Sequence, residues 1–123
     1  MHHLKLNVMT SGNHPSKNTI QLLLDTKTDY GNEGYAFVSN KNNVQITSHT
    51  AQGSFYGAQT LLQLIDIEKT NSGVEYTTTI AGVKIFDKPA FAYRGMHLDV
   101  CRHFYDKEFV KKYIDLLAMH KMN

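Results

Sequence analysis

The sequence predicts an α+β fold, in which a small antiparallel-rich sheet packs with a helix and is followed by one further strand and helix. Two observations predict this class. Apolar and polar residues alternate through the first half at the two-residue period of strands, whereas two later segments follow the helical period. The 123 residues, of which 41% are hydrophobic, are sufficient to build a compact core.

Short strands separated by polar turns are expected in the first half of the chain. The expected strands lie at 4–8, 19–24, 35–38 and 44–47. Turns that contain Gly, Asn or Ser are expected between them, at 11–15, 30–34 and 40–43. The segment 19–24 is largely apolar, which indicates the more buried strand. The close spacing of the last three strands favours an antiparallel meander.

A helix is expected from residue 53 to residue 66. The residues expected to lie in the core, rather than in a ligand groove, include Phe55, Tyr56, Leu61 and Leu62. Thr50 is expected to cap the helix, because its hydroxyl can accept a backbone N–H of the first turn. Gly57 costs about 1 kcal/mol relative to alanine inside a helix, and it therefore predicts a close approach to another element.

The remaining elements follow a turn at 71–73. A strand is expected at 77–86 and ends at the Asp-Lys-Pro sequence 87–89. A second strand is expected at 93–100, and Asp106 is expected to cap a helix that continues to about His120.

The last strand and helix predict the opening of a second domain. A strand with apolar and polar groups on both faces is typical of a barrel, which closes only with about eight β/α units. The expected domains are therefore 1–88, an α+β domain, and 89–123, the start of a truncated TIM barrel. Without barrel neighbours, the apolar stripe of the helix 106–120 should fold back on the α+β domain, pair with a second copy, or fray.

Composition excludes several functional classes. The net charge of +2, without a long basic run, argues against a nucleic-acid partner. No segment approaches the length of a membrane-spanning helix. Cys101 is the only cysteine, so the chain forms no internal disulfide.

The segment from Phe91 to Phe104 is the most specific feature. Its sequence, FAYRGMHLDVCRHF, closely resembles the segment that opens the barrel of the β-N-acetylhexosaminidases of glycoside hydrolase family 20. The helix ending at 116–123 is also typical of that family. Upstream, the blocks 33–35, 53–64 and 85–89 are similar to the α+β domain that precedes the barrel. The resemblance covers nearly the whole chain.

The resemblance implies a retaining exo-glycosidase that removes terminal β-linked N-acetylglucosamine or N-acetylgalactosamine from glycans. The acetamido oxygen of the substrate attacks the anomeric carbon, so no protein nucleophile is required. A neighbouring Asp–Glu pair on a later strand orients that group and protonates the leaving oxygen, and this pair lies beyond Asn123. No catalytic residue and no cofactor are therefore expected in this chain, which alone should be inactive. A periplasmic or secreted location is implied by the family.

Arg102 is the one residue that carries over as a substrate-binding group. It matches the family arginine that holds the ring hydroxyls opposite the leaving group, and a planar guanidinium suits two adjacent hydroxyls. Without the resemblance, the alternative is a solvated arginine at a strand end. Asp99 is expected to bond a nearby backbone group or arginine rather than to act in catalysis.

Other polar residues are expected to be structural. The spacing of Cys101 and His103, with His97 or Asp99, matches no compact zinc pattern, so no metal site is predicted. His103 is expected to be a structural partner of the strand end. Glu33 and Asp25 are interpreted as turn residues that do not form an acid–base pair.

Two alternative functions remain open at this point. The first is a stand-alone carbohydrate-binding or interaction module. The second is the N-terminal part of another barrel glycosidase, such as an α-glucuronidase or an enzyme that removes O-linked N-acetylglucosamine.

Overall fold

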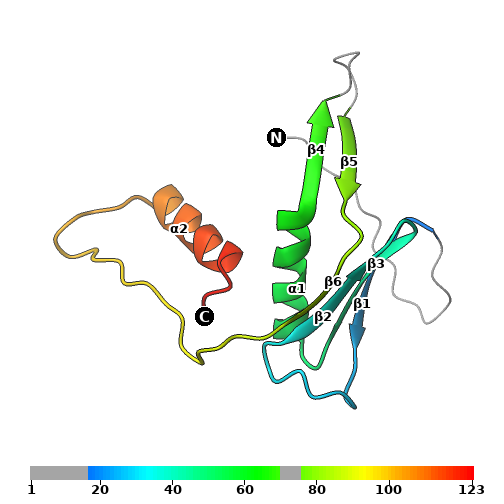
Figure 1. Cartoon of the computed structure of the whole chain (residues 1–123). Coiled ribbons are helices and arrows are strands. Elements are labelled where there is room, and N and C mark those ends of the chain that lie inside the picture. The colour runs from blue at the N-terminus through cyan, green and yellow to red at the C-terminus, as the bar shows by residue number, and fades with distance from the viewer. Residues whose placement is uncertain (1–16, 70–75) are drawn as a thin grey trace.

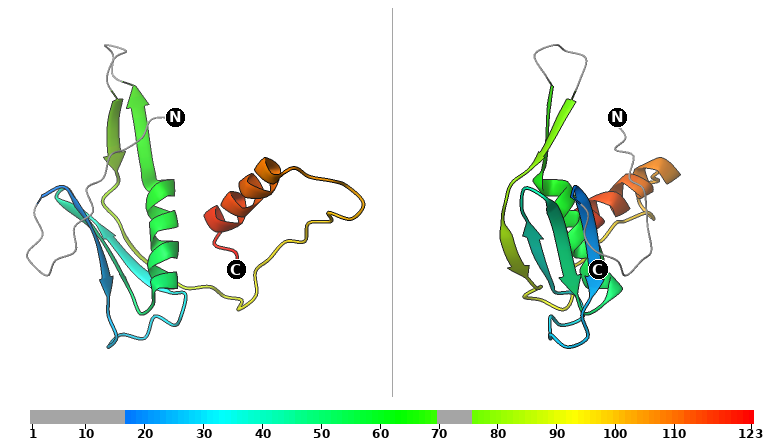
Figure 2. Two further views of the ribbon diagram at one scale, coloured as in Figure 1. Left: turned by 180° about the vertical axis from the view of Figure 1, so that it is seen from behind. Right: turned by 90° about the vertical axis from the view of Figure 1, so that its right-hand side faces the viewer.

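A computed structural model of the chain describes residues 17–69 and 76–123. The expected strand at 4–8 and the expected turns at 11–15 and 71–73 lie outside these residues. In the described part, a four-stranded sheet lies against helix α1, and helix α2 lies on the opposite side of α1 from the sheet (Figure 1 and Figure 2). The α+β class is therefore confirmed.

The four-stranded sheet has the order β1-β3-β2-β6. Its strands are β1 (Thr19–Leu24), β2 (Tyr35–Ser39), β3 (Asn43–Ser48) and β6 (Lys84–Asp87). The pairs β2–β3 and β2–β6 are antiparallel, but β1 pairs in parallel with β3. The predicted three-strand meander is therefore wrong for β1. The connection from β1 to β2 is too long to be a tight hairpin, so it does not force these two strands to be neighbours.

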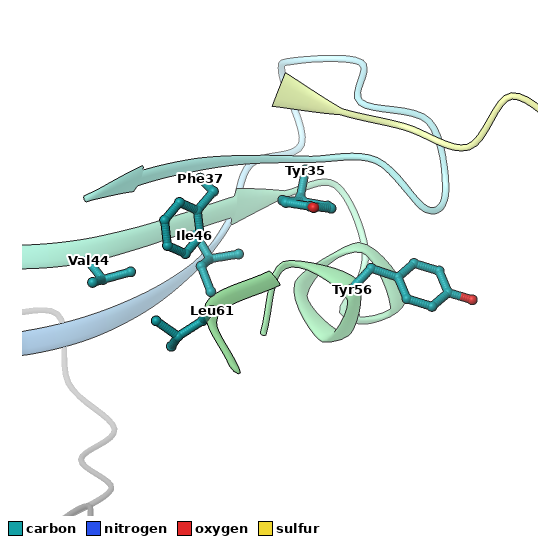
Figure 3. Packing of buried hydrophobic residues seen from close by; sticks show 6 residues of the cluster. All are labelled: Tyr35, Phe37, Val44, Ile46, Tyr56 and Leu61. Carbon is teal, nitrogen blue, oxygen red and sulfur yellow. The ribbon is translucent and has the colours of Figure 1, made fainter. Parts of the chain in front are cut away.

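The core lies between β2, β3 and α1 (Ala51–Leu64). Its buried apolar side chains, drawn in Figure 3, are Tyr35, Phe37, Val44, Ile46, Tyr56 and Leu61. Alternate residues of β2 and β3 are buried, as the two-residue period predicts. Thr50 caps α1, since its Oγ1 accepts the N–H of Gly53 at 3.1 Å. Both the cap and the close approach at Gly57 are confirmed, because a Cβ on Gly57 would lie 2.4 Å from Ile46 Cγ2.

Two predictions of burial are wrong. In β1, the side chains of Leu22 and Leu24 are 59% and 64% exposed, because this edge strand lies beside the core that α1 covers over β2 and β3. In α1, Phe55 and Leu62 are also exposed. The face that α1 buries combines two glycines, which allow close packing, with larger side chains; its residues are Gly53, Tyr56, Gly57, Thr60 and Leu61.

The segment after α1 forms two paired strands, although the helix was expected to continue to residue 66 and only one strand was expected after it. α1 ends at Leu64, and β4 (Ile65–Lys69) pairs in antiparallel fashion with β5 (Tyr76–Ile80). The strand predicted at 77–86 is thus divided between two sheets. The division coincides with Ser39, whose Oγ donates to Ala81 O at 2.5 Å and accepts the N–H of Val83 at 3.0 Å.

The second predicted domain shows its helix but not its strand. Residues 93–100 form no strand, because no other described strand pairs with their backbone groups. Helix α2 (Lys107–Met119) is capped by Asp106, which accepts the N–H of Phe109 at 2.7 Å, and this prediction is confirmed. No residue of α2 is buried.

Candidate functional site

Arg102 lies in a turn after the segment 93–100, and its position is set by Asp99. The two oxygens of Asp99 divide the contacts: Oδ1 accepts the backbone N–H groups of Cys101 and Arg102, and Oδ2 accepts Arg102 Nε at 2.5 Å. These hydrogen bonds, first that of the Arg102 backbone and then that of its side chain, lower the pKa of Asp99. The expectation that Asp99 bonds a nearby arginine is confirmed.

The guanidinium of Arg102 is oriented and still accessible. Its ion pair with Asp99 uses Nε, and the side chain is 85% exposed. The terminal amino groups are therefore available to a ligand, and they offer the paired donors that adjacent hydroxyls require.

The other residues considered around Arg102 do not assemble into a site. Cys101 is an exposed free thiol, and His97 and His103 are also exposed. Among the described residues, no group of three or more His, Cys, Asp or Glu side chains could hold a metal ion. Asp25 is the turn residue that was expected, since its carboxylate accepts Lys27 N and Thr28 Oγ1.

Glu33 has a role that the sequence did not predict. Its carboxylate accepts two hydrogen bonds from Arg94, Nη1 to Oε2 at 2.9 Å and Nη2 to Oε1 at 3.0 Å. Tyr56 OH and Asn123 Nδ2 also donate to Oε1, at 3.3 and 3.0 Å. The hydrogen bond from Arg94 is the largest cause of a lowered pKa for Glu33, and Glu33 in turn raises the pKa of Arg94.

A second polar cluster joins Tyr35, Thr60, Asp87 and Lys121. The buried hydroxyl of Tyr35 bonds Thr60 Oγ1 at 2.5 Å and donates to Asp87 Oδ2 at 2.8 Å. Lys121 Nζ donates to the same Asp87 oxygen at 2.8 Å and to Tyr35 OH at 2.7 Å. Burial opposes ionisation of Asp87 and Lys121, but these hydrogen bonds outweigh it, so the pKa of Asp87 is lowered and that of Lys121 is raised.

The two clusters border one small cavity. Its volume is about 260 Å³, and its lining includes Glu33, Asp87, Arg94 and Lys121. This volume lies below the range of about 300–1,000 Å³ that is usual for ligand pockets. These four charged side chains form two ion pairs, Glu33 with Arg94 and Asp87 with Lys121. The two pairs therefore link segments that are distant in the sequence.

Sequence reasoning missed these clusters because their partners are distant in the chain. Glu33 and Arg94 are 61 residues apart, and Tyr35 and Lys121 are 86 residues apart. The available signal was that both Glu33 and Arg94 stand in segments that resemble the family.

Neither helix in the described part of the chain has the length and apolar character that a membrane crossing requires.

Comparisons with known proteins relate both parts of the chain to one family. Residues 1–88 match the sequence model "Glycosyl hydrolase family 20, domain 2", and residues 91–123 match "Glycosyl hydrolase family 20, catalytic domain". The chain is 49% identical over 113 residues to a beta-hexosaminidase of Porphyromonas gingivalis, a match that covers 91% of this chain and 14% of that protein. It is 32% identical over 114 residues to a beta-N-acetylhexosaminidase of Cellulomonas fimi, with coverages of 93% and 22%.

The fold is similar to solved structures of the same family. The GH20 beta-N-acetylhexosaminidase from Streptomyces coelicolor A3(2) matches with a TM-score of 0.76 and 38% identity, over 89% of this chain and 22% of that chain. The GH20 exo beta-N-acetylglucosaminidase from Vibrio harveyi matches with a TM-score of 0.71 and 30% identity, over 85% and 15%. The chain spans less than a quarter of the length of each of these four relatives. Since a family model matches most of its residues, the chain belongs to glycosyl hydrolase family 20.

Proposed function

We propose that this chain is the N-terminal part of a β-N-acetylhexosaminidase that removes terminal β-linked N-acetylglucosamine or N-acetylgalactosamine from glycans. The observation that carries the proposal is the succession of the two family matches, the domain 2 match at 1–88 and the catalytic-domain match at 91–123. Relatives that match both parts of the chain are named as hexosaminidases. The family match favours this function over that of another barrel glycosidase.

The proposed division of the chain falls between residues 88 and 89. The last strand of the four-stranded sheet, β6, ends at Asp87, and the six buried apolar residues of the described core precede this point. Residues 1–88 then form a supporting α+β domain, and 89–123 contribute the first β/α segment of a catalytic barrel.

Arg102 is the proposed substrate-binding residue of this chain. The Asp99 carboxylate holds its Nε, which leaves the terminal amino groups to donate to the ring hydroxyls opposite the leaving group. The place of Arg102 after the segment 93–100 corresponds to the carboxyl end of a barrel strand, where active-site residues gather.

The chemistry of bond cleavage lies outside this chain. In the proposed mechanism the acetamido oxygen of the substrate is the nucleophile, and an Asp–Glu pair on a later strand orients it and protonates the leaving oxygen. We therefore expect the chain of 123 residues to release no product from an aryl β-N-acetylglucosaminide. Measurable turnover by the purified chain would contradict this expectation.

The function is tested with the gene product expressed to its natural stop codon. This protein should hydrolyse an aryl β-N-acetylglucosaminide, and Arg102→Ala should lower kcat/KM by about a hundredfold or more, because hydrogen bonds to a charged group contribute about 1.5–3 kcal/mol each. Lys107→Ala, which removes another exposed cation nearby, is the matched control and should change little. If Arg102→Ala leaves the activity unchanged, the hexosaminidase function would be retained but Arg102 would be rejected as the substrate-binding residue. A folded protein without activity would reject the proposed function.

A further inference from the structure

Apolar packing does not account for the placement of α2. Among the described residues, the buried apolar cluster contains none from 89 onward, and α2 buries none of its own residues. The large apolar side chains Phe109, Ile114 and Leu116 are 41%, 56% and 52% exposed. Even so, the end of α2 lies close to α1 (Figure 1), where Gln63 Nε2 donates to Met119 O at 2.8 Å.

The first attachment is the Glu33 carboxylate, which gathers both ends of the segment 94–123. Arg94 binds it with two hydrogen bonds, and the side chains of Arg94 and Glu33 are only 18% and 14% exposed. Asn123 Nδ2 binds the same carboxylate at 3.0 Å. Arg94 and Asn123 also bond each other, since Asn123 N donates to Arg94 O at 2.8 Å and Arg94 N donates to Asn123 Oδ1 at 3.0 Å. One carboxylate of the α+β domain thus fixes the start and the end of this segment together.

The second attachment is Lys121, whose backbone is strained. Its φ is +55°, a left-handed conformation that glycine usually supplies after a helix. The conformation closes α2, because Lys121 N donates to Ala118 O and Met122 N donates to Leu117 O. A lysine at this position carries what glycine cannot, an ammonium group that reaches Asp87 Oδ2 at 2.8 Å and the hydroxyl of Tyr35 at 2.7 Å.

The second attachment ends on neighbouring residues of the sheet, Tyr35 and Asp87. Tyr35 is 1% exposed, and the ring lies 5.0 Å from Lys121 Nζ, within the range of a cation–π contact. Asp87 ends β6 and pairs across the sheet with Tyr35. The lowered pKa values of Glu33 and Asp87 agree with this geometry, because both carboxylates are held in the charged form by the segment they bind.

We propose that a two-point clamp, formed by Glu33 with Arg94 and by Asp87 with Lys121, fixes the first β/α segment on the α+β domain. The clamp replaces apolar packing, so the orientation of α2 depends on polar contacts at its C-terminal end. In a longer protein, the same residues would hold the α+β domain against the face of the barrel where strands begin and helices end. The clamp joins the two parts of the chain whether or not the protein has the activity proposed above.

The test is the backbone ¹⁵N relaxation of the 123-residue chain. If the clamp holds, the amides of α2 and of β2–β3 should both have order parameters near 0.85 in the unaltered chain. In Glu33→Gln/Asp87→Asn, the values for α2 should fall below about 0.6 while those for β2–β3 stay unchanged. Glu108→Gln is the matched control, since it removes a carboxylate that pairs within α2 with Lys111 at 2.9 Å, and it should leave α2 coupled.

Two outcomes would overturn the clamp. In the first, α2 already moves independently in the unaltered chain. In the second, it stays coupled when both carboxylates are neutralised. If the double variant loses the signal dispersion of β2–β3, Arg94→Lys/Lys121→Met replaces it, because these substitutions leave the sheet residues intact and remove the forked contact and the ammonium. Persistent coupling of α2 in that variant would likewise overturn the proposal.

Discussion

Gly57 offers the sharpest test of how α1 packs on the sheet. A Cβ at this position would lie 2.4 Å from Ile46 Cγ2 and 3.2 Å from Tyr35 Cδ2, and both neighbours are fully buried. Gly57→Ala should gain about 1 kcal/mol of helix propensity and lose about 1–3 kcal/mol through overpacking. Because Ile46 has no exposed surface toward which it can move, we expect overpacking to cost the upper part of this range, about 2–3 kcal/mol, and the net destabilisation to be about 1–2 kcal/mol.

A double-mutant cycle isolates the contact. Ile46→Ala alone should destabilise the chain by about 2–5 kcal/mol, because it empties a fully buried site. Combined with Gly57→Ala, it removes the opposing methyl group and lets the new one fill part of the cavity. The double variant should therefore be at least about 1 kcal/mol more stable than the sum of the single changes predicts.

Urea unfolding monitored by circular dichroism measures these free energies. Gly82→Ala is the matched control, since its Cβ would meet only Ser39 O, at an ordinary 3.7 Å, and it should be neutral or slightly stabilising. A neutral or stabilising Gly57→Ala, or strictly additive effects in the cycle, would refute the close packing of α1 on β3.

Three further predictions follow from single contacts. Thr50→Ala should destabilise the chain by about 1 kcal/mol in urea unfolding, because it removes the cap on Gly53 N; an unchanged free energy would show that the cap is dispensable. The pKa values of Glu33 and Asp87 are lowered on folding, so their stabilisation is complete above their ordinary values of 4.5 and 3.8 and is lost as the pH falls through the lower folded values. The Tm should therefore fall in acid, and less steeply in Glu33→Gln; identical profiles would contradict this. Arg102→Ala should change the free energy of unfolding by no more than about 0.5 kcal/mol, because the side chain is exposed; a larger loss in urea would assign Arg102 a structural role.

The local elements could be predicted because their signals are local. The alternation in β2 and β3, and the caps Thr50 and Asp106, are each decided within a few residues. Gly57 was informative for a similar reason, since a glycine weakens the helix that contains it and therefore indicates close packing against a neighbouring element. The fold class followed from these elements.

The long-range pairings could not be predicted from periodicity. The sequence of β1 fits either a parallel or an antiparallel neighbour, and only the assembled sheet places it beside β3. The strand at 77–86 was predicted as one element because Ser39, which bonds Ala81 and Val83 at the break, is distant in the sequence. The segment 93–100 has the residues of a strand but no partner in the described chain.

The candidate site divides in the same way. Asp99 and Arg102 are three residues apart, so their contact could be predicted from local geometry. Glu33 lies in the expected turn, but its partner Arg94 is distant in the sequence and is reached only through the fold. Whether Arg102 binds the sugar stays a prediction.

The central proposal, that Arg102 binds ring hydroxyls of the sugar, is tested most directly by removing the side chain and a hydroxyl separately and together. The gene product expressed to its natural stop codon, and its Arg102→Ala variant, would each be assayed with an aryl β-N-acetylglucosaminide and with its 4-deoxy analogue. If Arg102 binds the ring hydroxyls, the unaltered protein should prefer the substrate with the 4-hydroxyl over the 4-deoxy analogue, and Arg102→Ala should lose much of this preference. The coupling free energy between the side chain and the hydroxyl should be about 1.5–3 kcal/mol. Equal losses from deoxygenation in both proteins would contradict the assignment of Arg102 as the substrate-binding arginine.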